Sequence, residues 1–137
     1  MQMLLAGRKI FYIEDDPDNR EIVGTTLEAH GAVVEFDEWA FAEIAMNRIR
    51  RFRPDLVLLD LMFSTGTSGY EVFDAIHRSQ TMSRMPVIIV SAADASIEIP
   101  RARAKGLDGY IAKPLNVTRL PEQVAEVIAG GKLWIGP

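Results

Sequence analysis

Five short apolar runs, each followed by a stretch with helical spacing, constrain the fold of this chain more than any other feature. Two of the runs, DLVLLDL and PVIIVSA, are almost continuously apolar, as is typical of strands covered on both faces. Strict alternation of strands and helices predicts a parallel, doubly wound α/β sheet. The strands are expected at Lys9–Glu14, Ala32–Phe36, Asp55–Leu61, Pro86–Ala92 and Asp108–Ala112.

Helical segments are expected between and after these strands. The DDPDN segment indicates a helix start, because Asp15 or Asp16 can cap the helix and Pro17 suits its first turn. That helix is expected to stop near Gly31, and Asn116 can cap the last one. The other helices are predicted over Trp39–Phe52, Tyr70–Ser79 and Asp94–Lys105, with the last ending near Ala129. Two apolar sets are expected to face the core: Phe41, Ile44, Ala45 and Ile49 in the second helix, and Leu120, Val124, Val127 and Ile128 in the last.

Two segments depart from this regular pattern. Pro100 lies in the middle of the fourth predicted helix, where a proline costs about 3 kcal/mol, so we expect that helix to be shortened or irregular. The tail GGKLWIGP is expected to be frayed or loosely docked. We therefore predict a single domain over residues 1–137, with its core between about 9 and 129 and a tail at 130–137.

Composition excludes several classes of function. A net charge of −4 disfavours direct nucleic-acid binding, and the lack of cysteine excludes thiol catalysis and cysteine-bound zinc. No apolar run approaches 18 residues, and the N-terminus lacks the order of a signal peptide, so we expect neither membrane insertion nor secretion. The chain is therefore predicted to be a cytoplasmic domain.

Polar side chains stand where four of the five predicted strands end. In doubly wound sheets the carboxyl ends of the strands meet at the ligand-binding edge. Each group alone has an ordinary explanation, such as a helix cap, a turn or a solvated loop lysine. Together they predict one cleft. The residues are Glu14, Asp15 and Asp16 after the first strand, Asp60 after the third, Ser91 after the fourth and Lys113 after the fifth.

Electrostatics indicates what this cleft holds. Two carboxylates about 4 Å apart repel by roughly 4 kcal/mol at an effective dielectric near 20. Three acids from two strands would therefore destabilise the fold unless cations balance them, and one lysine does not suffice. An oxygen-rich pocket without cysteine suits Mg²⁺, which binds a few carboxylate oxygens and keeps several waters.

The segments IEDD, LLD, IIVSA and GYIAKP, in this order and spacing, resemble the receiver domain of two-component response regulators, here a stand-alone receiver similar to chemotaxis regulators. The resemblance covers about Lys9–Ala129. It implies a flavodoxin-like, five-stranded parallel sheet of order 2-1-3-4-5 with helices on both faces. It also implies a phosphoryl-accepting switch that assists its own phosphorylation and dephosphorylation but is not a turnover enzyme.

The resemblance assigns roles to the residues of the cleft. Asp60 would accept a phosphoryl group from a phosphohistidine or from a small donor such as acetyl phosphate. Asp15 would bind Mg²⁺ directly and Glu14 through water. Asp60 would be a further metal ligand, and the backbone carbonyl of Met62 would complete the protein ligands. Asp16 would add negative potential only.

The remaining roles concern the phosphorylated state. Lys113 would pair with Asp60 at rest and with a phosphoryl oxygen afterwards, and the bond between Lys113 and Pro114 would be cis. The Ser91 hydroxyl would move toward the phosphoryl group while Tyr110 turns inward. The implied partners are a sensor histidine kinase or a histidine phosphotransfer protein, and a downstream protein target. The resemblance also allows a homodimer.

The chain departs from the family pattern beside the acceptor. Phe63–Ser64 replaces the usual Met-Pro pair, and the loop to Gly69 is one residue longer. The geometry beside Asp60 and the surface on which a kinase docks are therefore expected to differ from those of the family. Neither Met62 nor Ala93 can orient a hydrolytic water through its side chain, so we expect slow loss of the phosphoryl group. Pro100 disturbs the segment that, in the family, contributes to the output face.

Three alternatives remain open from the sequence. The STGTSG loop is similar to a phosphate cradle of a flavin- or nucleotide-binding module, although three acids follow the strand where such loops normally lie. The Asp16–Asp18 segment resembles an acid pair of a small aspartate-nucleophile phosphatase, but the chain has no room for a cap domain. A receiver-like module could also act by protein contact alone, without phosphorylation.

Overall fold

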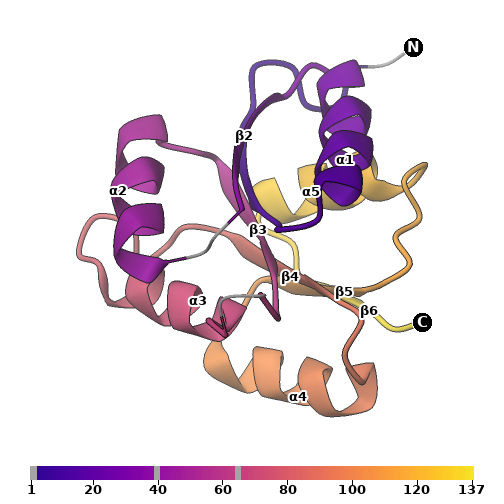
Figure 1. Ribbon diagram of the computed structural model, residues 1–137. Helices are drawn as coiled ribbons and strands as arrows, with labels where there is room; N and C mark the ends of the chain where they lie inside the picture. Colours follow the sequence, from indigo (N-terminus) through magenta and orange to yellow (C-terminus); the bar gives the residue numbers. More distant parts are fainter. Residues whose placement is uncertain (1–2, 39–40, 64–65) are drawn as a thin grey trace.

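A computed structural model describes residues 3–38, 41–63 and 66–137 of the chain. It contains one parallel sheet of order β2-β1-β3-β4-β5-β6, with helices on both of its faces (Figure 1). The strands are β1 (Lys9–Ile13), β2 (Val33–Asp37), β3 (Leu56–Asp60), β4 (Val87–Ser91), β5 (Gly109–Ala112) and β6 (Leu133–Ile135). The helices are α1 (Pro17–Ala29), α2 (Ala42–Phe52), α3 (Gly69–Arg78), α4 (Ala95–Lys105) and α5 (Leu120–Ile128). This confirms the predicted fold class.

Two apolar cores lie on either side of the sheet. Alternate side chains of each strand enter opposite cores, because successive residues of a strand point to opposite faces. Phe11, Leu59 and Tyr110 pack beneath α2, α3 and α4, whereas Ile10, Leu58 and Ile111 pack beneath α1 and α5. All five residues of β3 and of β4 are buried, as the two apolar runs predicted.

The expectation of a loose tail was wrong, because its residues 133–135 form β6 alongside β5. Leu133 is buried in one core and Trp134 packs against the other. The Leu133 N–H donates to the Asp108 carbonyl at 3.1 Å, and Lys132 Nζ lies 2.6 Å from Asp108 Oδ1. At Gly109 a Cβ would lie 3.0 Å from the Leu133 carbonyl oxygen, so the absent side chain allows the two strands to approach.

The expected shortening at Pro100 was also wrong, because α4 runs without a break over 11 residues. The proline cannot donate to the carbonyl four residues earlier, at Ser96. Both residues are exposed, so water can satisfy the freed carbonyl. Asp94 caps the start of the helix by accepting from the Ser96 N–H at 3.0 Å, and Gly106, with φ of 93°, ends it.

Two helices differ in detail from the prediction. On α2 the buried residues are Ala45, Met46 and Ile49, whereas Phe41 and Ile44 are about half exposed, so their assignment to the core face was wrong. The predicted start of this helix at Trp39 lies outside the described residues. The last helix begins at Leu120, four residues after Asn116, so Asn116 is not its cap. Instead, the Asn116 carbonyl accepts hydrogen bonds in the turn before the helix. The predicted core residues of this helix are confirmed.

Within the described ranges, no helix combines the length and the apolar character needed to cross a lipid bilayer.

Candidate functional site

Three carboxylates meet at the carboxyl-terminal edge of the sheet. Glu14 and Asp15 directly follow β1, and Asp60 is the last residue of β3, the neighbouring strand. One oxygen from each residue lies within 4.8 Å of the other two. The side chains that the sequence predicted to share a cleft are therefore brought together by parallel pairing of β1 with β3.

Lys113 is the cation that faces this cluster. Its Nζ donates to Asp60 Oδ2 at 3.0 Å and to Glu14 Oε1 at 3.2 Å. Burial alone would lower the pKa of the Lys113 ammonium, but the charges of Asp60 and Glu14 outweigh burial and raise it. The lysine thus stays charged and compensates one of the three negative charges. It follows β5 and precedes a cis peptide bond to Pro114.

Glu14 is 1% exposed and has one unsatisfied oxygen. Oε1 accepts from Asn19 Nδ2 at 2.7 Å as well as from Lys113, whereas the buried Oε2 has no hydrogen-bond partner in the part of the chain that the structure describes. Burial raises the pKa of the Glu14 carboxyl to about 7, and the neighbouring Asp60 adds to the increase. A buried carboxylate oxygen without a hydrogen-bond partner, in a cluster of acids, is the kind of group that a metal ion or a metal-bound water can satisfy.

The loop after Asp60 brings the start of α3 close to the Asp60 backbone. The Met62 N–H donates to Asp60 Oδ1 at 3.3 Å, and Met62 forms an isolated antiparallel bridge with Ser68. A Cβ at Gly69 would overlap the Asp60 carbonyl oxygen, so only glycine fits at the start of α3. Phe63, which departs from the family pattern, is buried in the core, while Ser64 lies outside the described residues. The role of the Met62 carbonyl as a metal ligand stays a prediction.

Ser91 and Tyr110, on β4 and β5, are linked through the backbone of Ala93. Ser91 is 1% exposed, and its Oγ accepts from the Ala93 N–H at 3.0 Å. The Tyr110 hydroxyl donates to the Ala93 carbonyl at 3.5 Å, and its ring is fully buried. Tyr110 therefore already points inward in this structure, and β6 covers its strand. Whether the two residues move on phosphorylation stays a prediction.

The cluster fits a magnesium ion. Mg²⁺ binds oxygen ligands, commonly one or two carboxylates and several waters. Glu14, Asp15 and Asp60 supply only carboxylate oxygens, and Oε2 of Glu14 has no hydrogen-bond partner among the described residues. Asp16 stands outside this set, because its side chain caps α1 by accepting from the Asp18 N–H at 2.9 Å.

Comparison with known proteins is consistent with this geometry. A family model described as the response regulator receiver domain matches residues 10–125. The chain belongs to this family. The phosphate regulon transcriptional regulatory protein PhoB of Escherichia coli is 30% identical over 123 residues, which cover 89% of this chain and 52% of PhoB. Protein PilH of Pseudomonas aeruginosa is 27% identical over 122 residues, covering 89% of this chain and 98% of PilH.

Solved structures agree with the sequence comparison. The non-phosphorylated HemR receiver domain of Leptospira biflexa superimposes with a TM-score of 0.77 at 25% identity, covering 89% of this chain and 94% of that one. This receiver domain spans about half the length of PhoB. A receiver match over most of the chain gives no support to the flavin-binding or phosphatase alternatives.

Two residues of the receiver site were missed by the sequence interpretation. Asn19 on α1 bonds the Glu14 carboxylate, and Arg20 Nη1 donates to the Glu14 carbonyl at 2.7 Å. Arg20 also pairs with Glu38 at 3.4 Å. Their position in the first turn of α1, directly above the acidic run, is the signal that could have identified them.

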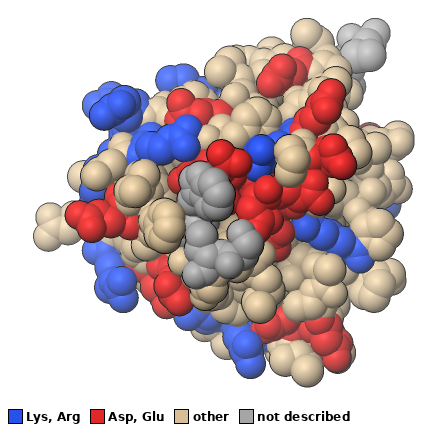
Figure 2. Space-filling view, in the orientation of Figure 1, with Lys and Arg blue, Asp and Glu red and all other residues tan. Residues whose placement is uncertain are grey.

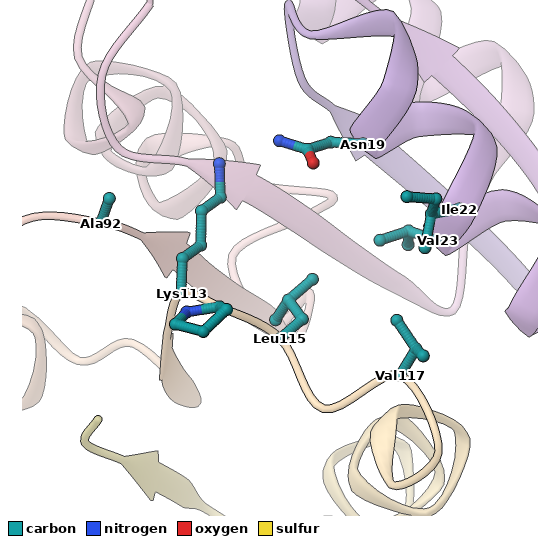
Figure 3. A pocket seen from close by; sticks show the side chains of 8 residues that line it. Asn19, Ile22, Val23, Ala92, Lys113, Leu115 and Val117 are labelled. Carbon is teal, nitrogen blue, oxygen red and sulfur yellow. The ribbon is translucent and has the colours of Figure 1, made fainter.

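An apolar cleft of about 630 Å³ adjoins the receiver site at Lys113. In Figure 3, Ile22 and Val23 of α1 face Leu115 and Val117 of the segment after β5 across this cleft. Ile22 is 51% exposed, so the cleft presents an apolar surface beside Lys113.

The raised pKa of Glu14 gives the metal-free receiver a predicted pH dependence. The unfolded carboxyl releases its proton near pH 4.5 and the folded one near pH 7, so between these values only the folded state keeps the proton. The free energy of unfolding should therefore fall between pH 5 and pH 8, by on the order of 2 kcal/mol. Urea unfolding in EDTA should show this slope for the wild type and a flatter one for Glu14→Gln. Equal slopes in the two proteins would contradict the assignment to Glu14.

Proposed function

We propose that this chain is a signalling switch in which Asp60 accepts a phosphoryl group in a magnesium-dependent reaction. The observation that carries the proposal is the position of Asp60, which lies beside the ammonium of Lys113 and the carboxylates of Glu14 and Asp15. Phosphoryl transfer places negative charge on the oxygens of the transferred group. A lysine on one side of Asp60 and a metal-binding pair of carboxylates on the other would stabilise that charge.

The chemistry requires little proton transfer by the protein. An Asp60 carboxylate oxygen attacks phosphorus, the bond between phosphorus and the donor histidine nitrogen breaks, and its electron pair returns to the imidazole. The product is an aspartyl phosphate. Lys113 then pairs with a phosphoryl oxygen, and the Ser91 hydroxyl donates to another. Bound Mg²⁺ would neutralise negative charge on the transferred group. Glu14, Asp15, Asp60 and the Met62 carbonyl would hold it.

The proposed partners follow from this chemistry. The donor is a sensor histidine kinase or a histidine phosphotransfer protein, and a small donor such as acetyl phosphate can replace it. The apolar cleft beside Lys113 supports docking of a protein donor, because apolar surface next to a reacting group can hold a partner in place. We further propose that the chain acts in the cytoplasm, by contact with a downstream protein, and is not a turnover enzyme.

Removal of the metal should stop phosphorylation. Incubation with acetyl phosphate and Mg²⁺ should add the mass of one phosphoryl group to the intact chain, and EDTA should prevent the gain. The reason is that Lys113 alone leaves the acidic cluster net negative, which repels an incoming phosphate. Intact mass spectrometry measures the outcome. Full mass gain in EDTA would overturn the metal requirement, and no gain under either condition would favour a receiver that works without phosphorylation.

A further inference from the structure

A groove lies between α2 and α3, away from the phosphoacceptor. It comprises two cavities of about 440 and 390 Å³ that share Arg50. The larger cavity is bounded by Pro54, which precedes β3, and by Met82 and Met85, which precede β4. These residues stand at the amino-terminal edge of the sheet, whereas Asp60 stands at the carboxyl-terminal edge. Figure 1 shows α2 and α3 side by side on one flank of the molecule.

The floor of the groove is apolar and rich in methionine. Ile49 and Met82 line the larger cavity, Met46 lines the smaller one, and all three residues are buried. Met85 is half-buried in the larger cavity. Methionine side chains are unbranched and polarizable, so they adapt to apolar groups of different shapes. Such a floor suits a protein side chain better than a fully polar ligand.

The rim of the groove carries three arginines and one exposed glutamate, Glu43, which lines the smaller cavity together with Arg50 and Arg78, so the rim has a net positive charge. Arg50, Arg53 and Arg78 line it and are exposed, and none of them forms an ion pair within the described ranges 3–38, 41–63 and 66–137. Among the described residues, the Arg50 side chain donates a hydrogen bond to the side-chain oxygen of Asn47, at 3.3 Å. Some arginines elsewhere do have carboxylate partners, as Arg48 has in Asp37 at 3.6 Å. In Figure 2 acidic side chains gather over the middle of the visible face, and many of the basic ones lie toward its left and lower margins.

Arg53 occupies a backbone position that favours glycine. It follows α2 with φ of 54°, the only positive φ of a non-glycine residue in the described part of the chain. Other helix ends here use glycine, as α4 does at Gly106. Residues in unusual backbone conformations often have a functional side chain. For Arg53 that function would be to add its guanidinium charge to the rim of the groove.

We propose that this groove binds an amphipathic acidic segment of a partner protein, at a site separate from the phosphoacceptor. Apolar side chains of the segment would contact the methionine floor, and its carboxylates would accept hydrogen bonds from the arginine rim. Charge complementarity and the apolar floor together favour this occupant over nucleic acid, because a phosphate backbone would contact the arginines but would gain little from the buried methionines.

The test uses a fluorescein-labelled helical peptide with leucines along one stripe and glutamates flanking it. Binding measured by anisotropy should be saturable with the wild-type chain and weaker by about tenfold or more with Arg50→Glu/Arg53→Glu. Arg50→Gln/Arg53→Gln should show a smaller loss and avoids acidic residues at a helix C-terminus. Arg119→Glu is the matched control, because Arg119 is exposed, lacks an ion pair among the described residues and precedes α5 on the other face of the sheet.

Two further measurements test the occupant and the site. A peptide with glutamine in place of glutamate should bind more weakly. In NMR spectra of the protein, peptide binding should shift the backbone amide signals of residues 46–54 and 75–85. Phosphorylation of the variants by acetyl phosphate should match the wild type, which shows that they are folded. Absence of saturable binding, equal loss with Arg119→Glu, or displacement of the peptide by single-stranded DNA would overturn the proposal.

Discussion

Asp60→Asn should abolish phosphorylation of the chain by acetyl phosphate and Mg²⁺. The amide is nearly the same size as the carboxylate, but its oxygen is a far weaker nucleophile toward phosphorus. The fold should persist, because the amide oxygen can still accept from the Met62 N–H and Lys113 keeps its bond to Glu14. Intact mass spectrometry should therefore show one added phosphoryl group in the wild type and none in the variant.

The matched control is Asp108→Asn, which changes a carboxylate outside the site. Asp108 accepts from the Val87 N–H at 2.9 Å and pairs with Lys132, so it contributes to the sheet and not to the acceptor. It should be phosphorylated like the wild type. Equal mass gain in Asp60→Asn and the wild type would place the acceptor at another residue.

Lys113→Met should destabilise the metal-free chain by about 3 kcal/mol, the low end for a broken buried ion pair. The reason is that the Lys113 side chain is 21% exposed while the side chains of Glu14 and Asp60 are 1% and 11% exposed, so the two acids would lose their compensating charge inside the protein. Urea unfolding in EDTA measures the loss. Added Mg²⁺ should then stabilise the variant more than the wild type, because the cluster it binds has become more negative.

Lys132→Met is the control for loss of an exposed ion pair. The pair with Asp108 is short, but the Lys132 side chain is 56% exposed, and exposed pairs contribute less than about 1 kcal/mol. Equal losses of unfolding free energy in the two variants would show that the buried ion pairs of Lys113 contribute no more to stability than an exposed pair does. That result would contradict the electrostatic basis of the proposed metal site.

The acidic cluster could be predicted from sequence because its members belong to strand ends. Apolar runs locate β1, β3 and β5, and parallel pairing then determines that the residues after them share an edge. Glu14, Asp60 and Lys113 were therefore placed together without coordinates. The same reasoning could not show that Glu14 Oε2 lacks a partner, since this depends on side-chain directions.

Other features were missed because they depend on contacts distant in sequence. The three residues of β6 carry too short a pattern to predict a strand, and their pairing relies on the space left by Gly109. Ile44 follows the helical apolar pattern, yet it faces solvent because Ala45 and Met46 take the core side of α2. The groove is likewise defined by the meeting of α2 with the segment before β4.

The sixth strand also affects how this protein behaves at high concentration. A long, unpaired outer strand is a template on which other chains can polymerise by backbone pairing. Here β6 shields the four residues of β5 and itself has only three, so it offers a neighbouring molecule little backbone to extend. At the opposite border, β2 carries the charged residues Glu35 and Asp37. Both borders of the sheet thus resist the edge-to-edge association that leads to fibrils.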